Sequence, residues 1–174
     1  MNVIRIILID DHHAVRRGIR SYLESFSDIQ IVGEASTGEE TVSQIGQWLP
    51  DVVVVDLMLP GGIDGIGVTR QLRTISPHTQ VVVLTAQQDN SRVLAALRTG
   101  ALGYVRKDGA PEALINAIRG ATRGQSVLDS AVAGEIFKEL SMDSKAKAVL
   151  NAKWTCCVCS RTAKPIERLP RRWS

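Results

Sequence analysis

The stretch 52–60, with the sequence VVVVDLMLP, decides the fold class of this chain of 174 residues. Its first four residues, Val52 to Val55, form an unbroken β-branched, apolar run. Such a run is typical of a strand that is buried on both faces, as in the middle of a parallel sheet. Asp56 follows it directly, and a carboxylate at the end of a buried strand needs a partner or a chemical role. Asp56 is therefore a candidate functional residue.

Strand-like and helix-like segments alternate on both sides of this stretch. The expected strands are Ile4–Ile9, Ile29–Glu34, Val52–Asp56, Gln80–Thr85 and Leu102–Val105. The expected helices are His13–Ser25, one that starts at the hydroxyl cap Ser36-Thr37, one that follows the loop Gly61–Gly67 and ends near Ile75, Asn90–Thr99 and Pro111–Arg123. Five strand–helix units predict a doubly wound α/β fold, with a five-stranded parallel sheet and helices on both faces.

The first expected helix has a clear amphipathic pattern. Its apolar residues recur at helical spacing, at Val15, Ile19, Leu23 and Phe26. Its basic residues are expected on the solvent side, at Arg16, Arg17 and Arg20.

Three other expected strands also end in reactive polar groups. Asp10 and Asp11 follow the first strand, Thr85 ends the fourth, and the fifth leads to Lys107. The carboxyl ends of parallel strands lie at one edge of the sheet, which is where open α/β sheets bind ligands. We therefore expect these side chains to meet Asp56 at that edge.

This set of residue types favours phosphoryl chemistry. Three neighbouring carboxylates repel one another unless a hard divalent cation such as Mg²⁺ lies among them. With the cation bound, one aspartate can act as a nucleophile toward a phosphoryl group. Phosphoryl transfer then requires positioning and charge neutralisation, which Lys107 and Thr85 can supply to two phosphoryl oxygens while the metal takes the third.

The same residues resemble the signature of the receiver domains of two-component response regulators, over residues 1–123. The resemblance rests on Asp10-Asp11, Asp56-Leu57-Met58-Leu59-Pro60, Thr85-Ala86 and Lys107. Further details are similar to the NarL/FixJ (LuxR-type) subfamily of transcription regulators, namely Asp11-His12-His13, Gly100-Ala101-Leu102-Gly103-Tyr104 and Lys107-Asp108. One departure is the loop between Pro60 and Asp64-Gly65, which is one residue longer than is usual in the family.

The resemblance implies a flavodoxin-like (CheY-like) fold with strand order 2-1-3-4-5. It also implies that a sensor histidine kinase transfers a phosphoryl group to Asp56. Mg²⁺ would be held by Asp10, Asp11, Asp56 and the backbone carbonyl of Met58. Thr85 and Lys107 would contact the phosphoryl group, and Thr85 and Tyr104 would form a switch pair. A signalling protein of this kind is not an enzyme, and a homodimer is one expected form of it.

Each of these residues, taken alone, has a simpler role. Asp10 or Asp11 would be a helix cap, Thr85 or Tyr104 an ordinary packed residue and Lys107 a solvated lysine, but jointly they match the family in order. His12 and His13 are expected to have a surface role. Aspartyl-phosphate phosphatases also place an aspartate after an apolar strand, but they use a second acid two residues later, where this chain has Met58. A dedicated phosphatase is therefore disfavoured.

Composition points to a cytoplasmic protein. Residues 1–150 contain no cysteine, which suits a reducing compartment. No signal peptide is expected, because Arg5 and two aspartates interrupt the first apolar stretch. No apolar run has the length of a membrane-spanning helix, so no membrane partner is expected.

The last third of the chain departs from the family. Residues 124–150 resemble an interdomain linker, with a helix expected at Asp129–Leu140. A helix-turn-helix that reads the major groove should follow. Residues 151–174 instead form a basic tail, expected to be irregular and disordered, with six Lys and Arg against one Glu. Pro165 and Pro170 break helices, and Cys156-Cys157-Val158-Cys159 lacks partners for a zinc site. Specific DNA binding by this chain is therefore not expected.

A shift of the reading frame is our hypothesis for this tail. Reverse translation of residues 151–174, read from the last base of codon 151, permits the string REVDVLRLLA(H/N)GKTNREIAKALV, which resembles the start of a LuxR-type DNA-binding domain. A one-base shift near Leu150 would explain the abrupt change in composition. The alternatives are a genuine basic tail that binds nucleic acid or membrane, and a stand-alone receiver that acts by protein contact or as a phosphate sink.

Overall fold

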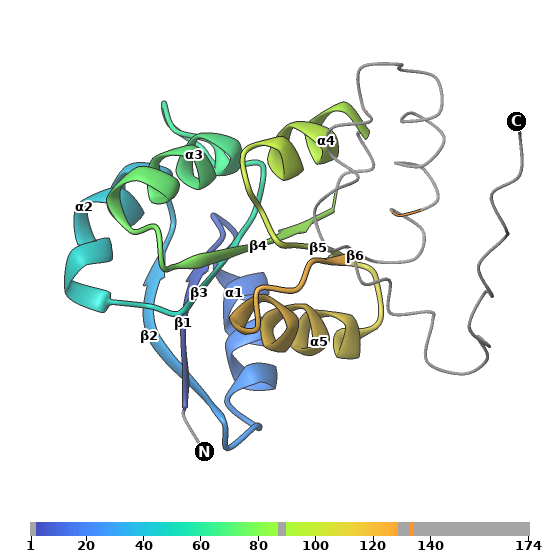
Figure 1. The fold of residues 1–174 in the computed structure, drawn as a ribbon. Helices are drawn as coiled ribbons and strands as arrows, with labels where there is room; N and C mark the ends of the chain where they lie inside the picture. The colour runs from blue at the N-terminus through green and yellow to red at the C-terminus, as the bar shows by residue number, and fades with distance from the viewer. Residues whose placement is uncertain (1–2, 87–89, 129–132, 134–174) are drawn as a thin grey trace, which may run out of the picture.

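A computed structural model describes residues 3–86, 90–128 and 133 of the chain (Figure 1). The tail 151–174 and nearly all of the expected linker helix lie outside the described residues. Ala133, the one described residue of that helix, is helical and buried. None of the described helices has both the length and the apolar character needed to cross a membrane.

Within the described residues, parallel strands form one sheet in the order β2-β1-β3-β4-β5-β6. The strands are β1 (Ile4–Ile9), β2 (Ile29–Ala35), β3 (Val52–Val55), β4 (Gln80–Thr85), β5 (Gly103–Arg106) and β6 (Val127–Leu128). The order of the first five confirms the predicted 2-1-3-4-5 topology. Valine side chains of β3 are fully buried because β1 and β4 flank that strand and helices cover both faces.

The sixth strand corrects the prediction of five. Val127 and Leu128, which we assigned to a linker, pair in parallel with Gly103 and Tyr104 of β5. The amide of Val127 donates to the carbonyl of Leu102 at 2.9 Å. A two-residue strand is too short to show any periodicity in the sequence, so only its pairing reveals it.

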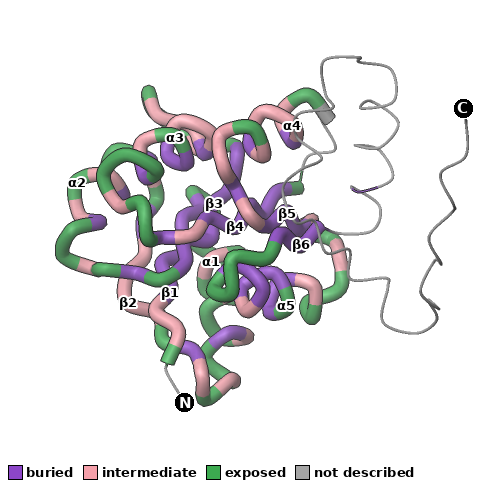
Figure 2. Tube along the Cα trace, in the orientation of Figure 1, coloured by how far each residue is buried: buried purple, intermediate pink, exposed green. Residues whose placement is uncertain are grey.

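Helices cover both faces of the sheet, as Figure 1 shows. They are α1 (His13–Leu23), α2 (Gly38–Trp48), α3 (Gly65–Ile75), α4 (Asn90–Arg98) and α5 (Pro111–Thr122). One core cluster joins the sheet to α2, α3 and α4, with Ile45, Leu72 and Ala96 among its members. The other joins it to α1 and α5 through Leu23 and Ile118. Figure 2 shows these buried segments running through the centre of the molecule. The doubly wound prediction is confirmed.

Capping residues explain two of the helix starts. Thr37 accepts a hydrogen bond from the amide of Glu40 at the start of α2, as its hydroxyl and position predict. Asp64 accepts one from the amide of Gly67 at the start of α3. Both caps leave these helices starting beside the carboxyl edge of the sheet, where the polar strand ends gather.

Candidate functional site

The two buried aspartates of the site lie side by side because their strands are neighbours. Asp10 follows β1 and Asp56 follows β3, and these strands pair in parallel. The amide of Asp56 donates to the carbonyl of Ile9 at 2.9 Å, which extends the ladder by one bond. Asp10 is 3% exposed and Asp56 is 5% exposed. Two carboxylates so nearly excluded from water require a compensating cation.

Lys107 supplies that cation from the neighbouring side. Its Nζ lies 2.6 Å from Asp10 Oδ2 and 2.5 Å from Asp56 Oδ2. The amide of Lys107 donates to the carbonyl of Thr85 at 2.9 Å, which ties the end of β5 to the end of β4. Burial by itself lowers the pKa of the Lys107 ammonium, but the hydrogen bonds to Asp10 and Asp56 outweigh it, so that its pKa is raised. Lys107 therefore stays charged and bridges the two aspartates.

Asp11 and His12 form the outer rim of the site. Asp10, Asp11 and His12 each offer a ligand atom, and these atoms lie within 4.8 Å of one another. His12 Nδ1 is 2.7 Å from Asp11 Oδ1, and the His12 side chain is mostly exposed. The amide of His12 donates to Asp10 Oδ1 at 2.8 Å, so Asp10 also supports the start of α1.

The loop after Asp56 is held close to the phosphoacceptor candidate. The amide of Met58 donates to Asp56 Oδ1 at 3.1 Å, while the Met58 side chain is exposed. A Cβ at Gly65 would lie only 2.2 Å from the backbone oxygen of Asp56, so no other residue fits there without moving the chain. The absence of a side chain at Gly65 thus allows α3 to start against the backbone of Asp56.

The loop after Pro60 has an anchor that the sequence analysis did not predict. Glu39 Oε1 accepts hydrogen bonds from the amides of Gly62 and Ile63 at 2.8 and 3.0 Å. Hydrogen bonds from backbone amides, first that of Glu39 itself and then those of Gly62 and Ile63, hold the pKa of Glu39 below its ordinary value. Gly61 adopts a φ of +101°, which favours glycine. The glycines of 61–67 predicted this loop, but they did not predict that Glu39 would hold it.

Thr85 and Tyr104 lie on the same face of the sheet. Thr85 ends β4 and is completely buried, and Tyr104 in β5 is 1% exposed. Tyr104 is opposite Val83 in the register, and Thr85 is two residues beyond Val83 on the same side of β4. This placement suits the predicted switch pair, whose role stays a prediction.

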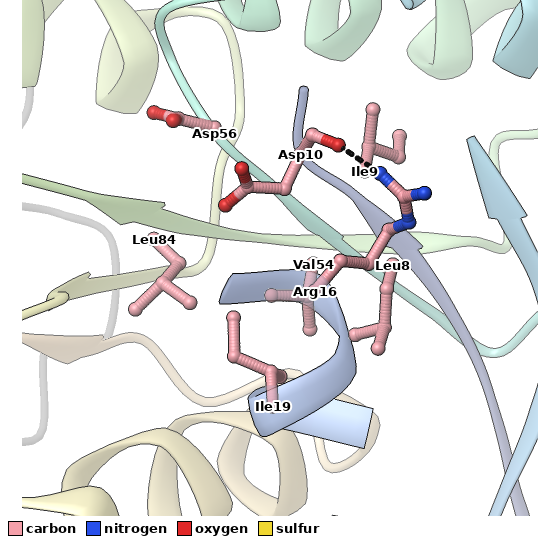
Figure 3. Close-up of a pocket in the computed structure, with 8 residues that line it drawn as sticks. All are labelled: Leu8, Ile9, Asp10, Arg16, Ile19, Val54, Asp56 and Leu84. Carbon is pink, nitrogen blue, oxygen red and sulfur yellow. Dashed lines mark hydrogen bonds between the residues drawn. The ribbon is translucent and has the colours of Figure 1, made fainter. Parts of the chain in front are cut away.

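Arg16 corrects another expectation, because its side chain does not lie in solvent. It lines a small cavity together with Asp10 and Asp56, and Figure 3 shows its guanidinium reaching back to the end of β1. The cavity measures about 10 Å³, which is room for about one water molecule. The Arg16 side chain is 14% exposed. Helical spacing predicted that Arg16 faces solvent, but its guanidinium instead bonds Glu34 of β2.

An open parallel α/β sheet with buried carboxylates and a bridging lysine at its carboxyl edge defines the receiver class of signalling domain. The profile of the family described as "Response regulator receiver domain" matches residues 6–119. The chain belongs to this family, and its relatives place it among the LuxR-type response regulators.

Individual relatives support the assignment. Over 138 residues the chain is 38% identical to the transcriptional regulatory protein LiaR of Bacillus subtilis, covering 79% of this chain and 65% of that protein. It is 36% identical to the response regulator UvrY of Escherichia coli over 134 residues, covering 77% and 61%. A solved LuxR-family response regulator from Aurantimonas sp. SI85-9A1 superposes with a TM-score of 0.76 at 34% identity, covering 80% of this chain and 99% of that one. The chain thus spans under two thirds of the length of these two curated relatives.

Proposed function

We propose that Asp56 accepts a phosphoryl group from a sensor histidine kinase. The observation that carries this proposal is the buried Asp56 carboxylate, which Lys107 and the Met58 amide hold at the carboxyl edge. It lies there beside Asp10 and Asp11, which we call the acid pair. A carboxylate fixed at both oxygens is oriented for attack on phosphorus. An O–P bond would form on Asp56 while the P–N bond of the kinase phosphohistidine breaks and its imidazole leaves.

The residues around Asp56 fit a hard divalent cation. Asp10 and Asp11 present carboxylate oxygens close together, and Asp56 adds a third carboxylate at the same edge. Oxygen donors of this kind match Mg²⁺. We assign the ligands to Asp10, Asp11, Asp56 and the carbonyl of Met58. A bound Mg²⁺ would neutralise charge on one phosphoryl oxygen.

Two further residues would complete the phosphoryl site. Lys107 already contacts Asp56, and its ammonium can stay near that carboxylate while it neutralises a phosphoryl oxygen. The Thr85 hydroxyl ends β4 next to Lys107 and would donate to another oxygen. A change at Thr85 would reach Tyr104, two residues along the same face, which supports the pair as the switch.

At the level of the whole chain, we propose a cytoplasmic signalling protein that is switched by phosphorylation rather than an enzyme. Its LuxR-type relatives include a named transcriptional regulatory protein. The tail 151–174 offers basic residues on a proline-broken sequence and no recognisable groove-reading helix. We therefore propose that this chain does not bind promoters specifically by itself. A stand-alone receiver that acts through protein contacts, including a second copy of the chain, is the alternative.

The phosphoacceptor is tested by incubating the protein with acetyl phosphate and Mg²⁺ and measuring its intact mass. Wild type should gain one phosphoryl group, and Asp56→Asn should gain none. Asp51→Asn is the matched control, because Asp51 lies at the opposite end of β3 and should leave the modification unchanged. Full modification of Asp56→Asn would show that another residue is the acceptor.

A further inference from the structure

Arg16 makes two contacts that join three elements of the fold. Its Nη1 donates to the backbone carbonyl of Asp10 at 2.5 Å, drawn as a dashed line in Figure 3. Its Nε donates to Glu34 Oε2 at 2.9 Å. Arg16 belongs to α1, Asp10 follows β1 and Glu34 belongs to β2. A guanidinium can make both contacts at once because its donors form a rigid, planar fork.

Glu34 is held in place from two sides. Arg20, one turn further along α1, places Nη1 2.5 Å from the second carboxylate oxygen of Glu34. Burial by itself raises the pKa of Glu34, but the hydrogen bonds from Arg20 and Arg16 outweigh it and lower the pKa. Glu34 is therefore an ionised, fixed partner, and it sets the direction in which Arg16 points.

The contact to Asp10 bears directly on the acid pair. The Asp10 carbonyl belongs to the peptide unit that joins Asp10 to Asp11, and a peptide unit is planar. Fixing its oxygen therefore also fixes the direction in which the chain enters Asp11. On the other side of the residue, the Asp10 amide donates to the carbonyl of Ala35 at 3.2 Å. Asp10 is thus held at its amide by β2 and at its carbonyl by Arg16.

We propose that Arg16 is a positioning residue for the acid pair, acting through the Asp10 carbonyl and anchored by Glu34. This inference rests on the proposed divalent-cation site, because the orientation it sets is that of two of the expected ligands, Asp10 and Asp11. Residues that bond to metal ligands and fix their orientation typically lower metal affinity by about 10- to 100-fold when they are removed. We expect metal affinity to fall only about tenfold. The reason is that, without Arg16, the Asp10 amide still donates its hydrogen bond to the carbonyl of Ala35 in β2.

A purely structural tie between α1 and β2 is the competing role for Arg16, and the chain contains a matched control for it. Arg20 also forms an ion pair with Glu34 from α1, and it forms a second one with Glu24, the residue that caps the end of α1, at 2.9 Å. Both of these partners lie outside the acid pair. Arg20→Ala should therefore loosen the tie between helix and strand while leaving the Asp10 carbonyl bonded to Arg16.

The test is a titration of the full chain with Mn²⁺ as a spectroscopic substitute for Mg²⁺, in which the free ion is followed by electron paramagnetic resonance. Arg16→Ala should weaken Mn²⁺ binding about tenfold, whereas Arg20→Ala should change it less than twofold. Asp11→Ala, which removes an expected ligand, should weaken it at least as much as Arg16→Ala. Circular dichroism and urea unfolding of each variant establish that the fold is retained.

Each result discriminates between the positioning role and the structural tie. Wild-type affinity in Arg16→Ala, or an equal loss in Arg20→Ala, would overturn the positioning role. If Arg16→Ala fails to fold, Arg16→Lys is measured instead: it keeps the charge but not the two-armed fork, and wild-type affinity in it would equally overturn the proposal. If wild type binds no Mn²⁺, the proposed cation site fails first, and that outcome is distinguishable from the failure of Arg16 alone.

Discussion

Replacing Lys107 by methionine tests whether its ammonium holds the two buried aspartates together. Methionine keeps most of the length and removes the charge, so Asp10 and Asp56 would face each other without the cation that bridges them. Removing one partner of a buried ion pair costs about 3–5 kcal/mol. The lower end applies here, because the amides of His12 and Met58 still donate to these carboxylates. We expect a loss of about 3 kcal/mol without divalent ions.

The assay is urea unfolding at neutral pH in the presence of EDTA, followed by circular dichroism. Neutral pH is appropriate because the pKa of Lys107 is raised above its ordinary value of 10.5. A raised pKa gives a stabilisation that is fully present below the ordinary value and is lost only as the pH rises through the folded-state value. A loss of about 3 kcal/mol corresponds to a drop of roughly 10 °C in melting temperature for a domain of this size.

Two comparisons make the Lys107 result interpretable. Arg106→Met is the control, because Arg106 pairs with the exposed Asp108, and solvent screening leaves an exposed ion pair with little effect on stability. Adding Mg²⁺ should stabilise Lys107→Met more than wild type, because its carboxylates no longer have an ammonium between them; a ligand at 100 times its Kd contributes about 2.7 kcal/mol. A variant that is as stable as wild type in EDTA would refute the charge-compensation argument.

The fold and the tail lead to three more predictions. Gly65→Ala should destabilise the protein by roughly 2 kcal/mol in thermal unfolding, because its Cβ would press against the backbone oxygen of Asp56. Asp28→Asn should lower the urea midpoint more at pH 7 than at pH 3: the hydrogen bond from Arg119 lowers the pKa of Asp28 below its ordinary value of 3.8, so its stabilisation is fully present above that value and is lost progressively as the pH falls through the folded-state value. Deleting residues 151–174 should abolish any retention on DNA at low salt and leave phosphorylation unchanged, because the basic residues of this sequence would bind phosphates without sequence preference.

Each of these predictions has its own control. Gly46→Ala suits the first, because a Cβ at Gly46 in α2 meets no atom within 4 Å and should be tolerated. For the second, a difference between wild type and Asp28→Asn that is as large at pH 3 as at pH 7 would mean that the stabilisation by the Asp28–Arg119 pair does not depend on ionisation of Asp28. For the third, a gel-shift assay at physiological salt with specific competitor decides: a sequence-specific complex would show that the tail is a genuine DNA-binding element and that the frame-shift hypothesis is wrong.

The sequence alone predicted which polar side chains would meet at the carboxyl edge of the sheet. Asp10, Asp56 and Lys107 each follow an apolar run, and parallel strands that alternate with helices bring such ends to one edge. The structure places these three side chains in contact, as expected. The bridging of both aspartates by one ammonium was not predicted, because it depends on where a flexible side chain reaches once β1, β3 and β5 are in place.

Two contacts of the structure could not be predicted from the sequence, those of Arg16 and of Glu39. Arg16 has the helical phase of a solvent-facing residue, and its turn toward Asp10 depends on Glu34 of a different strand. Glu39 lies in the first turn of α2, and it becomes an anchor because the amide of Gly62, in the loop after Pro60, donates to its carboxylate.

The sequence by itself determined the periodicities, the order of the strands and the types of residue at their ends, since these depend on local pattern and on general rules of chain connection. Only the tertiary structure decided which polar groups share a hydrogen bond. That choice depends on distances of a few ångströms between residues far apart in the chain, as between Asp56 and Lys107, and local pattern carries no information about such distances.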